Sequence, residues 1–373
     1  MIKKLTYCLF VIAVVALLTM GFSSHAEEEL PSPDGYVEQI LDELPSEIRS
    51  QLPQADTYDE LVSCIDSSYL LSLSLSFLKN SLNSVTSHLV FFLATLVISA
   101  LAERIESAFG KKESSISLYL SVLLIAYKSF SIVYTLFQEV SVFCQKVNAY
   151  MLTFTGVMSA VTFLGGGTML STTNSTSLSL TVSLLGSACT FLLLPIIKIS
   201  FATAVTSSAS NRINLSSLSG FIRGMFTFLI GIVSIISIVA ITFQTMLAQA
   251  EDTLAARSIR FAASSSIPIV GNAVGDSVRT MGAAVAVIQK SVGMVGVVAL
   301  VIMTLYPLSV LFSAKIAFSL SQTLAKLLDV ASAEKLLAEV SQLINMLMAT
   351  ISIISVLYIF VTGIFTGSTI LAS

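Results

Sequence analysis

Apolar residues occur along this chain in long blocks separated by short polar stretches. Seven blocks come near the roughly 20 residues that a helix needs to cross a bilayer. They are residues 88–102, 116–137, 150–170, 178–201, 225–247, 292–313 and 343–365. The first is short and has to borrow residues from Val85 onward. The pattern therefore predicts an all-α, polytopic transmembrane helical bundle with about seven spans.

Residues 267–288 are apolar but repeatedly interrupted. The interruptions are Pro268, Gly271, Gly275, Asp276 and Arg279. This pattern fits a re-entrant hairpin, a broken helix or an interfacial helix. Non-helical backbone at membrane depth is tolerated only where protein or a watery cavity satisfies its polar groups. The segment is therefore a candidate for lining a pore or binding a partner.

Residues 315–342 carry an apolar stripe at helical spacing. Its members are Ile316, Leu320, Leu324, Leu327, Leu328 and Ala331, and Lys326 and Asp329 oppose them. Ser332 is the expected N-cap of a following helix, with Glu334 in its first turn. We expect an amphipathic helix pair that lies on the membrane surface or against a partner.

The first 26 residues have the order of a secretory signal peptide. Lys3 and Lys4 precede an apolar run over residues 5–20, and a small-x-small triplet ends at Ala26. Cleavage places the mature N-terminus outside the cytoplasm, and the alternative is an uncleaved N-terminal anchor. A disulfide between Cys64 and Cys144 is possible, although unpaired membrane cysteines are favoured.

The charge is distributed unevenly along a very apolar chain. Only 11% of the residues are charged, against roughly 25% in soluble domains. Twelve of the 22 acidic residues lie between Glu27 and Asp66, where Arg49 is the only base. We therefore expect an acidic extracytoplasmic head over residues 27–84 and a transmembrane bundle over residues 85–373. The head suits a basic partner or serves as a solvated spacer.

The positive-inside rule does not fix the topology of seven spans. With the head outside, the loop at residues 103–113 falls inside, and so does the region around Arg257 and Arg279. Arg223 and Lys335 would fall outside, so basic residues would occur on both sides.

Few residues point to catalysis. The chain contains neither a G-x-x-x-x-G-K-[ST] nor an H-E-x-x-H motif, and His88 is the single histidine after the signal peptide. No Asp or Glu falls within the seven predicted spans, which argues against an aspartyl dyad and weakens a proton-coupled carrier. We expect no enzyme activity, no catalytic or metal-binding residue, no cofactor and no nucleic-acid partner.

Lys128 is the one charge near the centre of a predicted span, where a lysine is costly. It would line a pore or pair with a partner, or else bond a backbone carbonyl or snorkel to the interface. Small residues suggest tight helix packing. The pairs Gly220 and Gly224, and Gly271 and Gly275, are spaced for close approach, and Gly293 and Gly296 share another small face.

One region resembles a known family. Its residues are Arg257-Ser-Ile-Arg260-Phe261-Ala-Ala, then Ile267-Pro268-Ile269-Val270-Gly271, then Asp276 and Thr280. This stretch is similar to the stage III sporulation protein AE family. The resemblance is sharp over residues 257–296, and in layout it extends over nearly the whole chain.

The resemblance implies a function. Members are made in the mother cell of endospore-forming bacteria and sit in the membrane around the forespore. With other stage III A proteins, one of them an ATPase, and with stage II sporulation protein Q from the forespore side, they are thought to build a transenvelope channel. The chain would then be a non-enzymatic, multi-pass subunit in the lipid bilayer. The alternative, a stand-alone solute permease, predicts paired broken helices in two related halves. The candidate pore or partner residues are Lys128, Arg257, Arg260, Pro268, Gly271, Gly275, Asp276 and Arg279.

Overall fold

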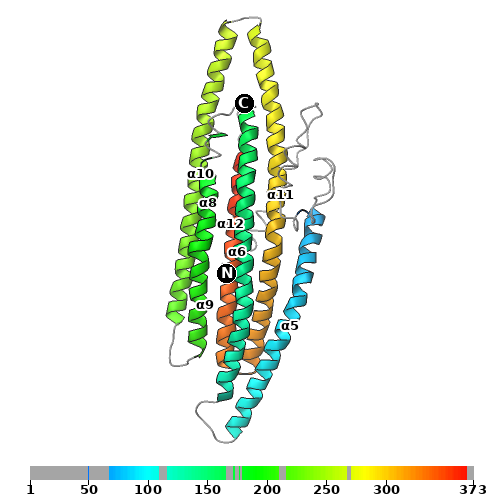
Figure 1. Ribbon diagram of the computed structural model, residues 1–373, viewed down its shortest axis with the longest axis vertical. Helices are drawn as coiled ribbons and strands as arrows, with labels where there is room; N and C mark the ends of the chain where they lie inside the picture. Colours follow the sequence, from blue (N-terminus) through cyan, green and yellow to red (C-terminus); the bar gives the residue numbers. More distant parts are fainter. Residues whose placement is uncertain are drawn as a thin grey trace.

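A computed structural model describes residues 49, 67–108, 116–164, 171–172, 176, 179–209, 216–266 and 270–367. The elements are α5 (Ser67–Ala108), α6 (Ile116–Leu164), α8 (Ser179–Ala188), a π-helix η2 (Cys189–Leu193), α9 (Leu194–Ala209), α10 (Ser216–Ser266), α11 (Val270–Leu327) and α12 (Ala331–Gly367). The described residues form an elongated bundle of antiparallel helices without a strand (Figure 1). The prediction of an all-α bundle is confirmed. The signal peptide and most of the acidic head lie outside the described residues, but residues 67–84 of the head form the first part of α5.

Six of the described helical segments are long and apolar enough to cross a membrane. The candidate spans are Ser68–Ala102, Val122–Leu164, Ser179–Ser207, Ser217–Phe243, Val285–Leu327 and Ala331–Gly363. The expected number, about seven, is close to this, and the difference arises because two predicted spans lie in the single helix α6. Between them Glu139 and Lys146 add charge, but residues 138–149 contain neither Gly nor Pro to stop the helix. At about 74 Å, α6 is far longer than the bilayer core.

Helices α8, η2 and α9 follow one another in a single candidate span, Ser179–Ser207. Pro195 lies two residues after the end of the π-helix and has no backbone N–H to donate. The N–H of Leu194 bonds the carbonyl of Cys189, five residues back. The wider turn thus lies where proline disturbs the α-helical hydrogen-bond pattern.

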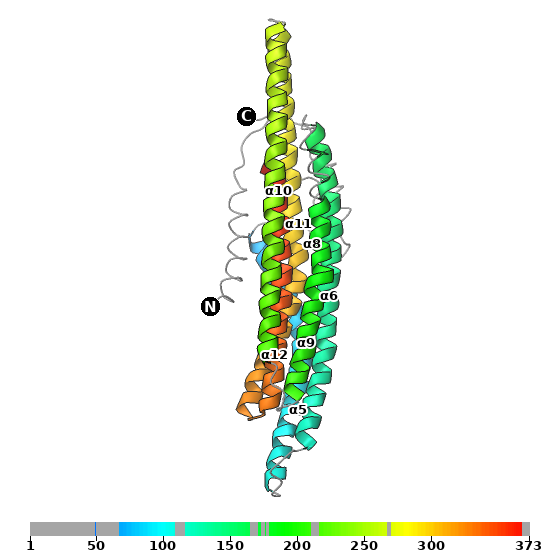
Figure 2. The same ribbon diagram turned by 90° about the vertical axis from the view of Figure 1, so that its left-hand side faces the viewer.

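Helices α10 and α11 form a hairpin that extends beyond the other helices at the upper end of Figures 1 and 2. The candidate span in α10 ends at Phe243, whereas the helix continues to Ser266, about 35 Å farther. Helix α11 is continuous from Val270, so residues 270–288 contain neither a re-entrant hairpin nor a break in the helix. Residues 267–269, which include Pro268, lie outside the described part of the chain.

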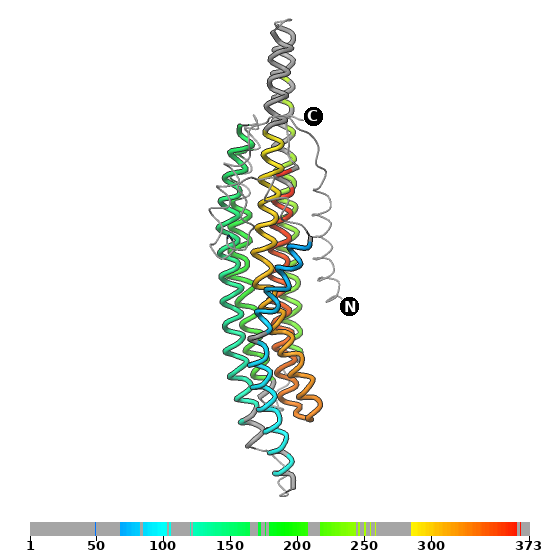
Figure 3. Tube along the Cα trace, turned by 90° about the vertical axis from the view of Figure 1, so that its right-hand side faces the viewer, coloured from blue at the N-terminus to red at the C-terminus, as the bar shows by residue number. Residues whose placement is uncertain are grey.

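The core follows the seam between α11 and α12. Buried residues of α11 recur at alternating intervals of three and four: Leu311, Ala314, Phe318, Ser321 and Ala325. They meet a buried face of α12 that includes Leu337 and Ile344. This spacing is that of helices packed knobs-into-holes. Helix α5 runs along the outside of the bundle beside α11 (Figure 3).

The predicted amphipathic pair is the lower end of this seam rather than a surface helix pair. Helix α11 ends at Leu327, and Asp329 has φ 61°. The N–H of Val330 bonds the carbonyl of Ala325, and that of Asp329 bonds Lys326, which is a Schellman motif. Helix α12 begins at Ala331, so Ser332 is inside the helix and is not its N-cap.

Candidate functional site

Lys128 lies between α6 and α5. Its side chain is half-buried, and its Nζ is 5.7 Å from the centroid of the Phe91 ring. That distance allows a cation–π contact, which partly compensates the loss of water around the ammonium group. The contact explains how a lysine persists in a candidate span. A pore or partner role for Lys128 stays a prediction.

The other candidate residues gather at the upper end of the α10–α11 hairpin. Arg257 and Arg260 belong to α10, and Gly271, Gly275, Asp276 and Arg279 belong to α11. Pro268 lies outside the described residues. Because the two helices are antiparallel, Arg260 is level with Asp276, and Arg257 is level with Arg279. The structure describes the backbone here and not these side chains, so their role also stays a prediction.

Polar residues that the sequence reasoning missed join α10 to α12 near the lower end. Arg223 Nη2 is 3.5 Å from Glu339 Oε1. The hydroxyl of Ser219 donates to Glu339 Oε2 at 2.8 Å, and Arg223 Nη2 donates to the same hydroxyl at 3.1 Å. Arg223 is therefore part of a packed helix contact and not a loop charge.

A lysine in α12 ties that helix to α9. Lys335 Nζ donates to the backbone carbonyl of Ser207 at 2.9 Å, near the C-terminal end of α9, where helix carbonyls lack internal partners. Glu339 and Glu139 both lie inside candidate spans, so the expectation that the spans contain no carboxylate was wrong. The carboxylate content of the spans therefore does not weigh against a proton-coupled carrier.

A buried polar cluster joins α6, α8 and α12. The Tyr358 hydroxyl, on a side chain that is 1% exposed, is 3.2 Å from Asn148 Oδ1 and 3.4 Å from the carbonyl of Val182. Gly186 leaves room for the amide, because a Cβ there would meet Asn148 Oδ1 at 2.9 Å. The cluster satisfies polar groups in an apolar interior and fixes three helices relative to one another.

Two cysteines border this cluster. Cys144 and Cys189 are buried free thiols. The alternative of a Cys64–Cys144 disulfide is therefore wrong for Cys144, and Cys64 lies outside the described residues. Buried thiols in apolar surroundings are usually structural rather than reactive.

The glycine patterns had different outcomes. A Cβ on Gly296 would overlap the ring of Phe154 on α6, and one on Gly293 would overlap Thr366 on α12, so this small face does allow close packing. At Gly220 and Gly224, an added Cβ would have nothing within 4 Å, so the predicted close approach is wrong within this chain.

These contacts join helices and do not assemble a catalytic group. In the described ranges, no three His, Cys, Asp or Glu side chains come close enough to hold a metal ion. The strongest interhelical polar residues, Asn148, Glu339 and Tyr358, were missed. One feature of the sequence could have identified two of them, because Asn148 and Glu339 are polar residues next to a long apolar block. The same feature does not identify the residues that they contact on other helices.

The sequence matches the model of the stage III sporulation protein AE family over residues 63–369. The chain belongs to this family. No curated protein and no solved structure is similar enough to match it. The match includes the hairpin, on which the residues that first suggested the stage III sporulation protein AE family lie, and it identifies a multi-pass membrane protein of sporulation.

Proposed function

We propose that the chain is a non-enzymatic, integral membrane subunit of a sporulation channel complex that links mother cell and forespore. Family membership carries this proposal. The long hairpin supports it, because α10 and α11 extend beyond their candidate spans where the family resemblance is sharpest. Such an extension offers a surface to other proteins and has no role in crossing the bilayer.

The packing favours a subunit over a stand-alone permease. A permease of the inverted-repeat type places substrate near the bilayer midplane at broken helices. In this chain the described core is filled by large side chains such as Phe92, Phe154 and Phe318, each 0% exposed. The described ends of α10 and α11, at Ser266 and Val270, lie far from that core. A conduit would then run between subunits rather than through one chain.

The six-span topology suggests an orientation. Arg104, Arg223, Lys326 and Lys335 all belong to the lower end of the bundle, and the sequence adds Lys111 and Lys112 in the adjoining loop. By the positive-inside rule this end faces the cytoplasm of the mother cell. The mature N-terminus and the hairpin then face the space between the two membranes.

This orientation separates two classes of partner. The lower end is available to a cytoplasmic ATPase of the stage III A group. The hairpin, with Arg257, Arg260, Asp276 and Arg279, contacts stage III A proteins on the forespore side, and reaches stage II sporulation protein Q indirectly through them.

Co-purification from sporulating cells tests the proposal. The full chain carries a C-terminal tag and is extracted in gentle detergent. We expect stage III A proteins to accompany it, and we expect Arg257→Glu with Arg260→Glu to reduce their recovery at an unchanged membrane level. The matched charge reversal Lys111→Glu with Lys112→Glu lies at the opposite end and retains the forespore-side partners. Recovery of the tagged chain alone, in cells that express those partners, would favour the permease.

Cysteine labelling tests the orientation separately. In a Cys64→Ser background, Ser266→Cys lies at the hairpin and Ser114→Cys in the loop after α5. The variants are expressed in non-sporulating cells, where the chain inserts in the cytoplasmic membrane and the cell exterior corresponds to the space between the two membranes. A membrane-impermeant maleimide applied to their intact protoplasts should label the first variant and spare the second. The reverse pattern would place the hairpin in the cytoplasm and contradict the proposed contacts.

A further inference from the structure

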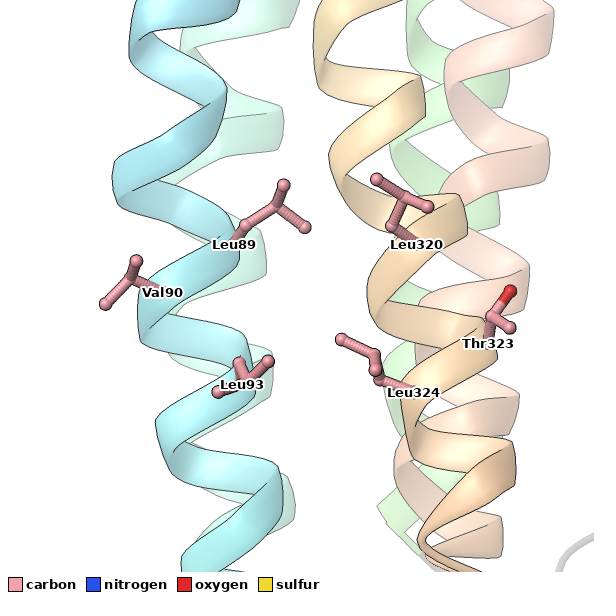
Figure 4. Close-up of a pocket in the computed structure, with 6 residues that line it drawn as sticks. All are labelled: Leu89, Val90, Leu93, Leu320, Thr323 and Leu324. Carbon is pink, nitrogen blue, oxygen red and sulfur yellow. The ribbon is translucent and has the colours of Figure 1, made fainter.

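Helix α5 begins at the end of the bundle from which the α10–α11 hairpin extends. Its register against α11 follows from two contacts. The rings of Phe77 and Tyr306 have centroids 5.8 Å apart. Farther along the same two helices, Leu89 and Leu320 face one another across a common groove (Figure 4). The helices are therefore parallel, and the same offsets place Ser67, the first residue of α5, level with residues 296–298 of α11.

The chain before Ser67 is long enough to reach any part of the hairpin. The candidate span of α5 begins at Ser68, at the end where that of α10 stops at Phe243. Helix α11 begins at Val270, about 40 Å beyond the level of Ser67. Residues 27–66, here called the acidic segment, extend to at most about 130 Å. The acidic segment and the hairpin are therefore on the same side of the bilayer, whichever compartment that side faces.

An exposed face of α10 continues from the bilayer onto the hairpin. Phe243, Met246 and Leu254 are 63%, 64% and 65% exposed, and Ser258 is exposed as well. Their spacing places all four on one face of the helix. Because the candidate span ends at Phe243, Leu254 lies about 16 Å farther out, where an uncovered leucine faces water.

Basic residues follow this face, and the acidic segment has the opposite charge. Arg257 comes three positions after Leu254, which places the two on the same side of α10. The outer part of the hairpin, residues 253–280, has three arginines and one aspartate in its sequence. The acidic segment has 12 acidic residues and one arginine. The two regions are therefore complementary in charge and belong to one chain.

One stretch of the acidic segment matches the exposed face in both apolar and charged positions. Its apolar residues recur at i, i+3, i+4 and i+7, which predicts an amphipathic helix. They are Val37, Ile40, Leu41 and Leu44, and the acidic residues between them are Glu38, Asp42 and Glu43. Such a helix presents an apolar stripe with carboxylates along its borders.

We propose that residues 37–44 dock on the exposed face of α10 beyond the bilayer. Their apolar positions cover Met246 and Leu254, and their carboxylates lie beside Arg257 and Arg260. The tether holds the segment at an effective concentration of about 1 mM, so a contact with a dissociation constant of about 0.1 mM is about 90% formed. The contact lies within one chain and does not rest on the proposed role in sporulation. A protein that binds the hairpin has to displace the acidic segment first.

Photocrosslinking from α10 tests the contact. Ser258→Cys carries a benzophenone maleimide beside the proposed site, and Ser217→Cys carries it at the opposite end of the same helix, at a position that is also exposed. A background with Cys8→Ser and Cys64→Ser leaves only two native cysteines, both of them buried. The full chain is irradiated in detergent, and crosslinked peptides are identified by mass spectrometry in the monomer band.

We expect the probe at Ser258→Cys to crosslink to residues 27–48, and the probe at Ser217→Cys to give no such product. The absence of a crosslink between Ser258→Cys and the acidic segment would overturn the proposal. Crosslinked dimers in place of that product would also overturn it, because they assign the exposed face of α10 to a second copy of the chain.

Charge reversal separates docking from chance proximity of a tethered segment. Glu38→Lys with Asp42→Lys should lower the crosslink yield from Ser258→Cys about tenfold, as a contact weakened about a hundredfold would at the same effective concentration. Adding Arg257→Glu with Arg260→Glu should restore the yield, which loss of a helix in the segment would not allow. A yield that ignores the first reversal, or that the second fails to restore, would contradict the charge pairing.

Discussion

Replacing Gly296 with alanine tests the tightest helix contact in the bundle. A Cβ at this position would overlap the ring of Phe154, with the ring atoms Cδ2 and Cζ at 3.0 and 3.1 Å. Phe154 is 0% exposed, so the ring has little room to move. Overpacking of this kind costs about 1–3 kcal/mol of folding free energy. The gain in helix propensity from glycine to alanine is about 1 kcal/mol and offsets part of it.

Gly224 provides the matched control, because the same substitution there meets nothing within 4 Å. The propensity term is common to both variants and cancels in the comparison. Gly224→Ala should therefore be more stable than Gly296→Ala by about 1–3 kcal/mol, which is the packing cost alone.

The assay is thermal unfolding of both variants in the same detergent, followed by far-ultraviolet circular dichroism. We expect Gly296→Ala to melt below the wild type and Gly224→Ala at or above it. Adding Phe154→Leu removes the ring, so its effect in the Gly296→Ala background should be smaller than in the wild type. Equal melting temperatures for the two glycine variants would refute the reasoning.

Three further experiments have expected outcomes. Tyr358→Phe removes hydrogen bonds to Asn148 and a carbonyl, and should lower stability by about 1 kcal/mol in the same melting assay. A double-mutant cycle on Arg223→Ala and Glu339→Ala should give a coupling below about 1 kcal/mol, since the Arg223 side chain is 32% exposed. A larger coupling would mean that this pair is screened less than its exposure implies. Asp329→Gly should raise the melting temperature and Asp329→Val should lower it, because φ is positive there.

The all-helical membrane bundle was predictable because block hydropathy depends only on composition along the chain. The number of spans was harder to predict from the sequence. Counting blocks of bilayer length divides α6 at Glu139 and Lys146, yet both residues are good helix formers. Hydropathy measures where lipid is favoured, whereas the length of a helix depends on where a breaker stops it.

The interhelical contacts were beyond prediction for a different reason. Gly224 and Gly296 look alike in sequence, and only helix rotation decides which one meets a neighbour. Similarly, Tyr358 reaches Asn148 across 210 residues, at a depth and rotation that no local pattern specifies. The Asp329 turn was missed because a charged residue had been assigned to the polar face of a helix.

The π-helix at Cys189–Leu193 has a consequence for comparing related chains. A π-turn holds one residue more than the α-helical repeat, so every position after Leu194 is rotated by about 100° from where an unbroken α-helix would place it. An alignment that allows no gap here would match the outward face of one relative to the inward face of another. A relative that has no proline at position 195 and no π-turn would need one residue fewer in this span. Its buried and exposed positions beyond that point would nevertheless agree with those of this chain.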